Sequence, residues 1–260
     1  FFKLDTNNEK NIIQHIKNKD FIIPLSALVG APLCEKKKKL ATMTNVGSLK
    51  LLMKHIKRNQ KIIYPTTNSG YGIGEKNAYC DENSEINPIS HYGKTKMEAE
   101  KLILKHKNSI SFRLATVFGS SFRMRTDLLV NNFVYEAFYN NKLVLFEENF
   151  RRNYIHINDI VLAFLFSIKN FKKLKSNVYN LGLSSANITK HDLAKKIKKH
   201  IPKTKILIKN DRKDPDKRDY FVSNKKIEKK GFKAVYSLDH GIKELINIFK
   251  ISRVNIKNNY

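Results

Sequence analysis

Short apolar segments alternate with longer segments of helical character along this chain, and this alternation constrains the fold more than any other feature. The apolar segments lack a regular alternation of polar and apolar residues, so they are expected to be strands that are buried on both faces of a sheet. Strands that are joined by helices pair in parallel, because such a connection must cross the sheet. The sequence therefore predicts an α/β fold with a doubly wound parallel sheet.

The order of the predicted elements indicates where a ligand would bind. Strands are predicted over Phe1–Leu4, Phe21–Ser26, Lys61–Thr66, Ser111–Thr116, Lys142–Phe146, Val178–Leu181 and Lys205–Ile208, with a further strand and helix within Tyr154–Lys169. Helices are predicted near Glu9–Lys17, Thr42–Arg58, Ser90–His106, Leu128–Phe138, Lys190–His200, Asn224–Lys230 and Asp239–Phe249. The regular alternation of predicted strands and helices ends after Phe118, so we expect a smaller C-terminal α/β lobe. Ligands of doubly wound sheets bind beyond the carboxyl ends of the strands, which makes Ser26–Pro32, Thr67–Ile73 and Thr116–Arg125 the candidate binding loops.

The charge, the apolar runs and the cysteine content indicate whether nucleic acid, a membrane or a metal ion is an expected partner. The chain of 260 residues has a formal net charge of +27, but only nine of its 50 Lys and Arg residues are arginine. Nucleic-acid sites gather arginine with stacking aromatic residues, so we predict no nucleic-acid partner. No apolar run approaches the roughly 20 residues that cross a membrane, so no membrane partner is predicted. Cys34 and Cys80 stand alone, so we predict no metal site and expect a cytoplasmic protein.

A tyrosine and a lysine four positions apart give the strongest chemical signal. Tyr92 and Lys96 share a face of the predicted helix, because residues i and i+4 are neighbours on a helix surface. The ammonium group is expected to lower the pKa of Tyr92 from its usual value of about 10 toward neutrality. Thr67 follows the preceding predicted strand, and its hydroxyl can bind the same substrate oxygen. The three side chains could polarise an alcohol for loss of hydride to a nicotinamide.

Several motifs in the same order carry a family resemblance. Residues 64–72 read Tyr-Pro-Thr-Thr-Asn-Ser-Gly-Tyr-Gly, and residues 87–96 read Asn-Pro-Ile-Ser-His-Tyr-Gly-Lys-Thr-Lys. They resemble the active-site strand and the start of the active-site helix in the extended short-chain dehydrogenase/reductase superfamily, and within it the NAD-dependent nucleotide-sugar epimerase/dehydratase family. Segments 21–27, 113–119, 152–159 and 178–182 are similar to further motifs of that family.

The resemblance implies roles for individual residues. Thr67, Tyr92 and Lys96 match the catalytic triad, and Tyr92 and Lys96 would also contact NAD. Cofactor-lining positions are matched by Leu25, Ser26 and Ala27, and Asp5 matches an acidic residue near the adenine. Arg152 matches the arginine that binds the diphosphate of a nucleotide-diphosphate sugar, and a guanidinium group suits phosphate. Further candidates for substrate binding are Asn68, Thr116, Arg123, Arg125, Arg212 and Arg218.

The sequence departs from the family pattern in two places. None of its ten glycines forms the Gly-x-x-Gly-x-x-Gly turn that lets a backbone approach a dinucleotide pyrophosphate. We therefore expect a Rossmann domain whose first βαβ unit is missing. Asn68 and Ser69 stand where the dehydratases of the family carry an Asp-Glu acid and base pair, which disfavours elimination of water.

Together these features predict NAD-dependent epimerisation of a nucleotide-diphosphate sugar through a transient keto intermediate. Two alternatives stay open: a nucleotide-ketosugar reductase, and a non-catalytic nucleotide-sugar-binding module, which the absent glycine-rich turn favours. The nucleobase, the sugar and the inverted carbon also stay open. The resemblance further implies a homodimer and a role in polysaccharide biosynthesis. We expect the Rossmann domain over residues 1–120 and 151–177, and the substrate lobe over residues 121–150 and 178–260.

Overall fold

Four parallel strands form the largest sheet of the protein. The computed structural model describes residues 2–74, 78–209 and 218–251. The strands of this sheet lie in the order β1 (Phe21–Ile22), β2 (Lys61–Thr67), β4 (Ser109–Leu114) and β8 (Asn177–Leu181). Every neighbouring pair is parallel. The predicted α/β fold with a parallel sheet is confirmed.

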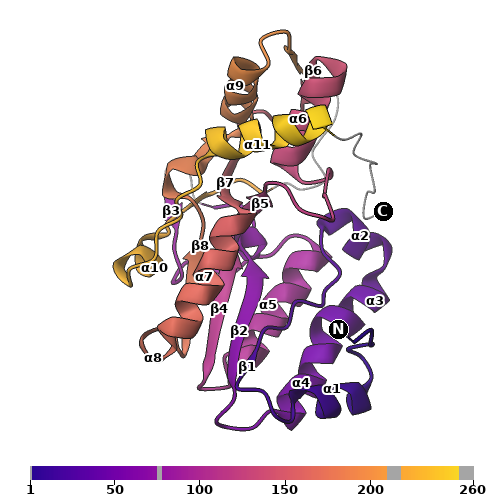
Figure 1. Cartoon of the computed structure of the whole chain (residues 1–260), viewed down its shortest axis with the longest axis vertical. Coiled ribbons are helices and arrows are strands. Elements are labelled where there is room, and N and C mark those ends of the chain that lie inside the picture. The colour runs from indigo at the N-terminus through magenta and orange to yellow at the C-terminus, as the bar shows by residue number, and fades with distance from the viewer. Residues whose placement is uncertain (1, 75–77, 210–217, 252–260) are drawn as a thin grey trace.

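Helices cover both faces of this sheet, and the buried residues of β2 show why. Ile62 and Tyr64 pack with residues of α1 (Glu9–Ile16), α4 (Ser48–His55) and α5 (His91–Ile103). The intervening Ile63 belongs to a different cluster, with residues of α7 (Ile157–Lys169). In Figure 1, α7 lies in front of the strands, whereas α4 and α5 lie on their other side. A strand that is buried on both faces needs apolar residues at successive positions, which explains its sequence.

A second layer lies above the carboxyl ends of these strands (Figure 1). Its elements are β5 (Thr116–Phe118), α6 (Leu129–Asn140), β6 (Lys142–Leu145), β7 (Arg151–His156), β9 (Asn187–Thr189), α9 (Lys190–His200), β10 (Lys205–Ile208) and α11 (Leu238–Ile251). β6 pairs in parallel with β10, and β7 lies between β5 and β9. The apolar cluster of this layer joins α6, α9 and α11 through buried residues such as Val134, Leu193 and Leu245. β8 straddles the predicted boundary between residues 177 and 178 and pairs with β4 of the large sheet, and the division into two lobes stays a proposal.

Shorter elements complete the described chain. They are α2 (Ala31–Lys36), α3 (Lys38–Thr42), the π-helical turn η1 (Met43–Gly47), the 3-10 turn η2 (Asn68–Tyr71), β3 (Tyr79–Cys80), α8 (Phe171–Leu174), η3 (Ser184–Ala186), β11 (Phe221–Val222) and α10 (Lys225–Lys229). β3 pairs with β11, which connects the segment after η2 to the C-terminal part of the chain. None of the helices in the described ranges is long and apolar enough to cross a membrane.

Three segments differ from the predicted elements. The predicted strand over Phe1–Leu4 is wrong for residues 2–4, which have no regular secondary structure, and Phe1 lies outside the described residues. A strand persists only when its backbone is paired, and in the described part of the chain nothing pairs with the outer edge of β1. β1 ends at Ile22 rather than at Ser26, because only Phe21 and Ile22 pair with β2. The helix predicted over residues 42–58 consists of α3, η1 and α4 and therefore begins four residues earlier.

Candidate active site

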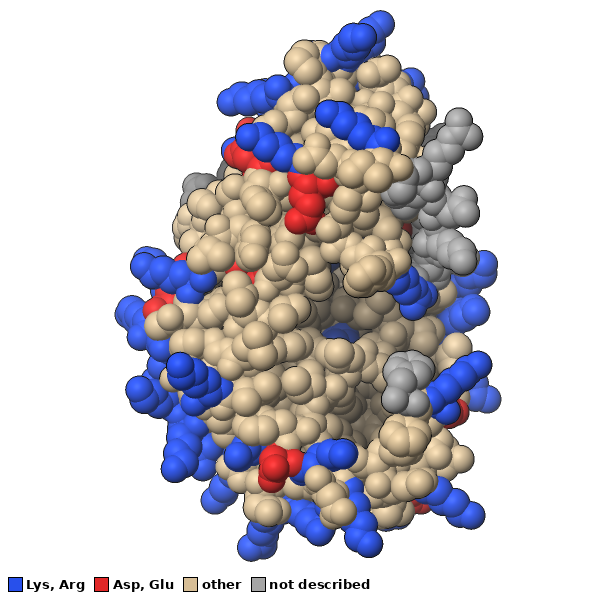
Figure 2. Space-filling view, in the orientation of Figure 1, with Lys and Arg blue, Asp and Glu red and all other residues tan. Residues whose placement is uncertain are grey.

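Two adjoining cavities lie at the carboxyl ends of the large sheet. The first has a volume of about 380 Å³ and the second about 290 Å³, and Ser69, Tyr92, Thr116, Arg125 and Arg218 line both. Figure 2 shows a hollow at the centre of one face, while the Lys and Arg side chains of that face spread around the molecule rather than gathering in one patch. The cavities lie where doubly wound sheets bind their ligands.

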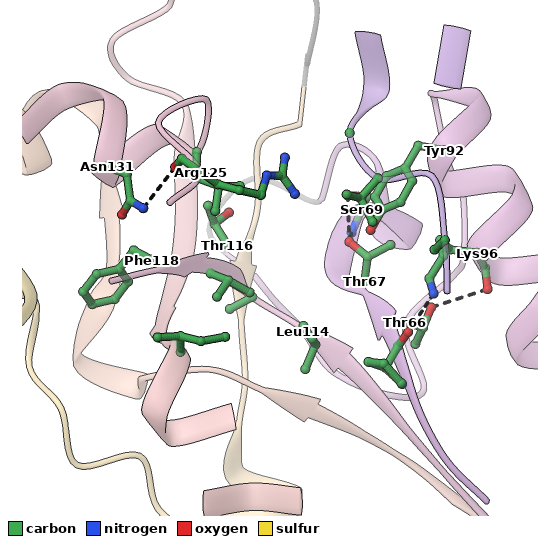
Figure 3. Close-up of a pocket in the computed structure, with 18 of the residues that line it drawn as sticks. Thr66, Thr67, Ser69, Tyr92, Lys96, Leu114, Thr116, Phe118, Arg125 and Asn131 are labelled. Carbon is green, nitrogen blue, oxygen red and sulfur yellow. Dashed lines mark hydrogen bonds between the residues drawn. The ribbon is translucent and has the colours of Figure 1, made fainter. Parts of the chain in front are cut away.

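Local capping interactions place two of the predicted catalytic side chains at this cavity. β2 ends at Thr67, whose Oγ1 accepts a hydrogen bond from the Ser69 amide at 3.1 Å and caps the turn η2. α5 begins after Ser90, whose Oγ accepts from the Gly93 amide at 3.1 Å. Tyr92 therefore stands in the first turn of α5 and faces the end of β2. Figure 3 shows the Tyr92, Thr67 and Ser69 side chains together on one wall of the first cavity.

Lys96 lines the same cavity, but its ammonium group is bound to partners other than Tyr92. Nζ donates to the Tyr64 hydroxyl at 2.6 Å and to the Pro65 carbonyl oxygen at 2.7 Å. Burial lowers the pKa of Lys96 to about 7. The expectation that Lys96 lowers the pKa of Tyr92 is wrong for this structure. Burial raises the pKa of Tyr92, and the charge of Arg218 is the strongest influence that lowers it. The reason is that β2 packs directly beneath α5 and supplies two acceptors that bind the ammonium group.

The opposite wall of the cavity is rich in arginine. Arg125 belongs to a loop that the Asn131 side chain holds, because Asn131 Nδ2 donates to the carbonyl oxygens of Gly119 at 3.1 Å and Arg125 at 3.0 Å. In Figure 3 the Arg125 side chain extends into the cavity from this loop. Its Nε also donates to Asp127 at 3.0 Å. The charged residues lining the two cavities are Lys96, Arg123, Arg125, Asp127, Arg152 and Arg218, so cations predominate and an anionic ligand is favoured.

The structure brings most of the predicted site residues together. Those that line the cavities are Leu25, Ala27, Thr67, Tyr92, Lys96, Thr116, Arg123, Arg125, Arg152 and Arg218. Arg152 is 2% exposed, and Nη1 donates to the Arg151 carbonyl oxygen at 3.0 Å. Lys96 and Ala27 both line the first cavity, and Arg152 and Arg218 both line the second.

Three predicted residues do not line these two cavities, and a fourth cannot be placed. Asp5 is exposed, and its Oδ1 accepts from the Asn7 amide at 2.9 Å. Ser26 Oγ is 3.0 Å from Thr6 Oγ1, outside the lining residues. Asn68 is buried, and its side-chain amide has no hydrogen-bond partner among the described residues. Arg212 lies outside the described residues.

Two residues that contact the predicted catalytic side chains were not predicted to be site residues. Ser69 is 3% exposed and lies between Thr67 and Arg218, with Oγ distances of 2.9 Å to Thr67 Oγ1 and 2.6 Å to Arg218 Nη1. Ser69 lies within the candidate binding loop Thr67–Ile73, and this position was the sequence signal that could have identified it as a site residue. Tyr64 binds Lys96 from the interior of β2, and its apolar surroundings give it the appearance of an ordinary core residue.

Thr67, Tyr92 and Lys96, the residues that the motifs match to the catalytic triad, all line one cavity at the carboxyl edge of the parallel sheet. The model of the NAD dependent epimerase/dehydratase family matches residues 1–182. The chain belongs to this family, so the resemblance that the motifs indicated is confirmed.

Individual relatives agree with this assignment. An uncharacterized UDP-glucose epimerase of Bacillus subtilis is 29% identical over 45% of this chain, and a UDP-glucose 4-epimerase of Lactobacillus helveticus is 26% identical over 58% of it. The matched parts span only 38% and 53% of those two relatives. The solved structure of UDP-glucuronic acid 4-epimerase from Bacillus cereus, in complex with UDP-glucuronic acid and NAD, superposes with a TM-score of 0.83. It is 22% identical and covers 96% of this chain and 81% of its own.

The residues of the first cavity fit the nicotinamide end of NAD, the cofactor of the family. Ala27, Leu114, Ala115 and Val117 provide an apolar wall for a planar ring. The ammonium group of Lys96 has three protons, of which Tyr64 and Pro65 accept two, so one is left for a ribose hydroxyl.

Proposed function

We propose that this protein catalyses NAD-dependent epimerisation of a nucleotide-diphosphate sugar through a transient keto intermediate. The observation that carries the proposal is the convergence of Thr67 and Tyr92 on one wall of a cavity whose opposite wall carries Arg125. This geometry suits a substrate with a reactive hydroxyl at one end and an anionic group at the other.

Tyr92, Thr67 and Lys96 have different roles in the oxidation of the reactive hydroxyl. When bound, NAD supplies a reversible acceptor for the hydride that leaves the sugar carbon. Tyr92, as the phenolate, takes the hydroxyl proton when that carbon is oxidised, and it returns the proton when the keto group is reduced. Thr67 donates a hydrogen bond to the same oxygen, and Lys96 binds a ribose hydroxyl of NAD. The proton and the hydride each leave once and return once, so the reaction has no net redox change.

The second cavity suits the diphosphate. Arg125, Arg152 and Arg218 line it together with Leu128 and Leu129, which begin α6. Within the described ranges no side chain caps the N-terminus of α6, so its first backbone N–H groups can donate to an anion. Guanidinium groups bind phosphate oxygens in a bidentate manner, which supports a nucleotide-diphosphate sugar as the substrate class.

The residues after Thr67 support epimerisation over dehydration. Elimination of water needs an acid that protonates the leaving hydroxyl and a base that removes a carbon-bound proton. Asn68 has no titratable proton, and it is buried outside both cavities. Ser69 is a hydroxyl that is already bound to Thr67 and Arg218. Neither side chain suits the acid or base role.

The experiment that tests the proposal incubates the protein with NAD and a panel of UDP- and dTDP-linked hexoses and uronic acids, with products identified by NMR. We expect conversion of at least one sugar into its epimer without net formation of NADH. Tyr92→Phe is expected to lower kcat by about 10²- to 10⁴-fold, because the proton acceptor is lost. Tyr139→Phe is the matched control, since the Tyr139 hydroxyl binds the Phe249 carbonyl oxygen away from both cavities, and it is expected to keep full activity.

Other outcomes would select other functions. Stoichiometric consumption of NADH or NADPH with a ketosugar would indicate the reductase. Binding of nucleotide sugars without any turnover, in the parent and in Tyr92→Phe alike, would indicate the non-catalytic module. The homodimer implied by the family resemblance stays a prediction, in which the outward faces of α4 and α5 would form the contact.

A further inference from the structure

A continuous series of polar groups runs from an arginine to the predicted catalytic hydroxyls. Arg218 Nη1 donates to Ser69 Oγ at 2.6 Å, and Ser69 Oγ lies 2.9 Å from Thr67 Oγ1. The Thr67 and Tyr92 side chains lie next to one another on the same wall of the first cavity. Ser69 and Thr67 are 3% and 7% exposed. Figure 3 shows the Ser69–Thr67 contact directly beside the Tyr92 ring.

The donor-only character of arginine sets the direction of these hydrogen bonds. A guanidinium group has no acceptor, so Ser69 Oγ must accept from Arg218. If Thr67 also donated to Ser69, the Ser69 proton would have no acceptor within the described ranges, in a side chain that is almost fully buried. Burying a hydrogen-bond donor without an acceptor is unfavourable. Ser69 therefore donates to Thr67.

The same reasoning fixes the proton of Thr67. Thr67 Oγ1 accepts from the Ser69 hydroxyl and also from the Ser69 backbone amide at 3.1 Å. A hydroxyl oxygen has two lone pairs, so both are occupied. The Thr67 proton is left to donate in the remaining direction, toward the Tyr92 oxygen and the cavity where the substrate hydroxyl would lie.

We propose that Ser69 and Arg218 are positioning residues that orient the Thr67 hydroxyl as a fixed hydrogen-bond donor, directed at the Tyr92 oxygen when the site is empty and at the reacting oxygen of the substrate when a substrate is bound. Neither residue acts on the substrate proton in this role. The catalytic role of these hydrogen bonds rests on the proposed epimerase function. The orientation of the Thr67 hydroxyl does not depend on that function. Arg218 would thereby supply part of the electrostatic support for Tyr92 that the sequence assigned to Lys96.

Other charged groups act on Tyr92 and must stay constant in a test. Arg218 and Arg125 favour its ionised form, and the Cys34 thiol on α2 opposes it. Lys96, one turn along α5, is bound to Tyr64 and Pro65. Substitutions at Ser69 remove or keep one neutral hydroxyl and leave all of these charges in place, so Ser69 is the decisive position.

The first test measures the pKa of the Tyr92 phenol in the absence of substrate. Tyrosines are replaced throughout by a fluorinated, more acidic tyrosine, and the ionisation of Tyr92 is followed by ¹⁹F NMR, with the signal assigned by Tyr92→Phe. Ser69→Ala is expected to raise the pKa of Tyr92 by about 0.5 to 1, because the Thr67 hydroxyl loses its fixed direction. Ser69→Thr keeps a hydroxyl at the position and is expected to restore the parent value.

Two further variants complete this titration. Arg58→Gln, an exposed change outside both cavities, is expected to leave the pKa of Tyr92 unchanged. Arg218→Met should also raise that pKa, and it serves as the second variant if Ser69→Ala does not fold. An unchanged pKa in folded Ser69→Ala, or in Arg218→Met where that variant is used, would overturn the proposal.

The second test uses the epimerase reaction. Ser69→Ala is expected to lower kcat about tenfold with little change in KM, since a higher pKa of Tyr92 leaves a smaller fraction of the phenolate that takes the substrate proton. Ser69→Thr should recover most of kcat. A rise in KM alone, or equal losses in Ser69→Ala and Ser69→Thr, would contradict a positioning role. If the parent turns over no nucleotide sugar, the proposed function fails, and the ¹⁹F titration still decides the orientation of Thr67.

Discussion

The ammonium group of Lys96 lies where water has little access. The residue is 4% exposed, and burial lowers its pKa to about 7 from an ordinary value of 10.5. Between these two pH values the unfolded chain binds a proton that the folded protein has lost. The stability of the parent therefore rises with pH across this interval, and the penalty for the buried charge is fully present below about pH 7.

Replacing Lys96 by methionine tests this penalty. Near pH 6, Lys96→Met is expected to be more stable than the parent by about 1–2 kcal/mol, after allowance for the two lost hydrogen bonds. The advantage should shrink as pH rises toward 10. Urea unfolding at a series of pH values measures it. Lys94→Met, an exposed change on the same helix, should stay within about 0.5 kcal/mol of the parent. An advantage of Lys96→Met that grows with pH would show that the ammonium group is not destabilised by burial.

Residue types and spacing were enough to predict much of the site, but not its internal partners. Thr67 and Tyr92 could be found because each stands at the end of an element that the sequence marks clearly. The partner of Lys96 could not be found, because the helical i, i+4 relation places it near Tyr92 but says nothing about the phenol of Tyr64 on the strand beneath. The hydrogen bond from Arg218 to Ser69 joins residues 149 positions apart, and no local pattern reports such a contact.

At the scale of elements, a buried ion pair fastens α5 to the large sheet. Arg113 Nη2 on β4 lies 2.7 Å from Glu100 Oε1 on α5, and both side chains are at most 7% exposed. Ser111 Oγ donates to the second carboxylate oxygen at 3.0 Å. α5 carries Tyr92 and Lys96, so the pair helps to hold the catalytic helix against β4.

Two glutamates on α5 allow a matched comparison. Glu100→Gln leaves the Arg113 charge buried without its counterion and is expected to destabilise the protein by about 3–5 kcal/mol. Glu98→Gln breaks an exposed pair with Lys50 at 3.3 Å and is expected to change stability by less than about 1 kcal/mol. Urea unfolding of both variants measures the difference. Equal effects of the two substitutions would mean that the buried pair does not fasten the helix.

Elements with strong local signals were predicted more accurately than elements that depend on distant partners. α9 has the predicted bounds Lys190–His200, because Thr189 and Asp192 form a capping box that marks its start. β1 is shorter than predicted, because its length is set by pairing with β2 rather than by its own apolar residues. α2 was missed, because six residues are too few for a helical period to be recognised.

At the scale of the whole molecule, the candidate site exists because two layers meet. The layer of the large sheet contributes Thr67, Tyr92 and Lys96, whereas the loop before α6 contributes Arg125 and the strand β7 contributes Arg152. The order of motifs along the sequence predicted the family and the parallel sheet. It did not predict that Arg218 would reach Ser69, because that contact depends on how the C-terminal segment packs on the large sheet.

The most direct test of the proposed epimerase reaction follows a deuterium label on the sugar carbon whose configuration is inverted. A nucleotide sugar that is identified as a substrate is labelled at that carbon and incubated with the protein and NAD in ordinary water. We expect an epimer that keeps its deuterium, with no net NADH, because the label leaves as hydride and returns to the same carbon. Loss of the label to solvent, or net accumulation of NADH, would contradict oxidation and reduction at a single carbon.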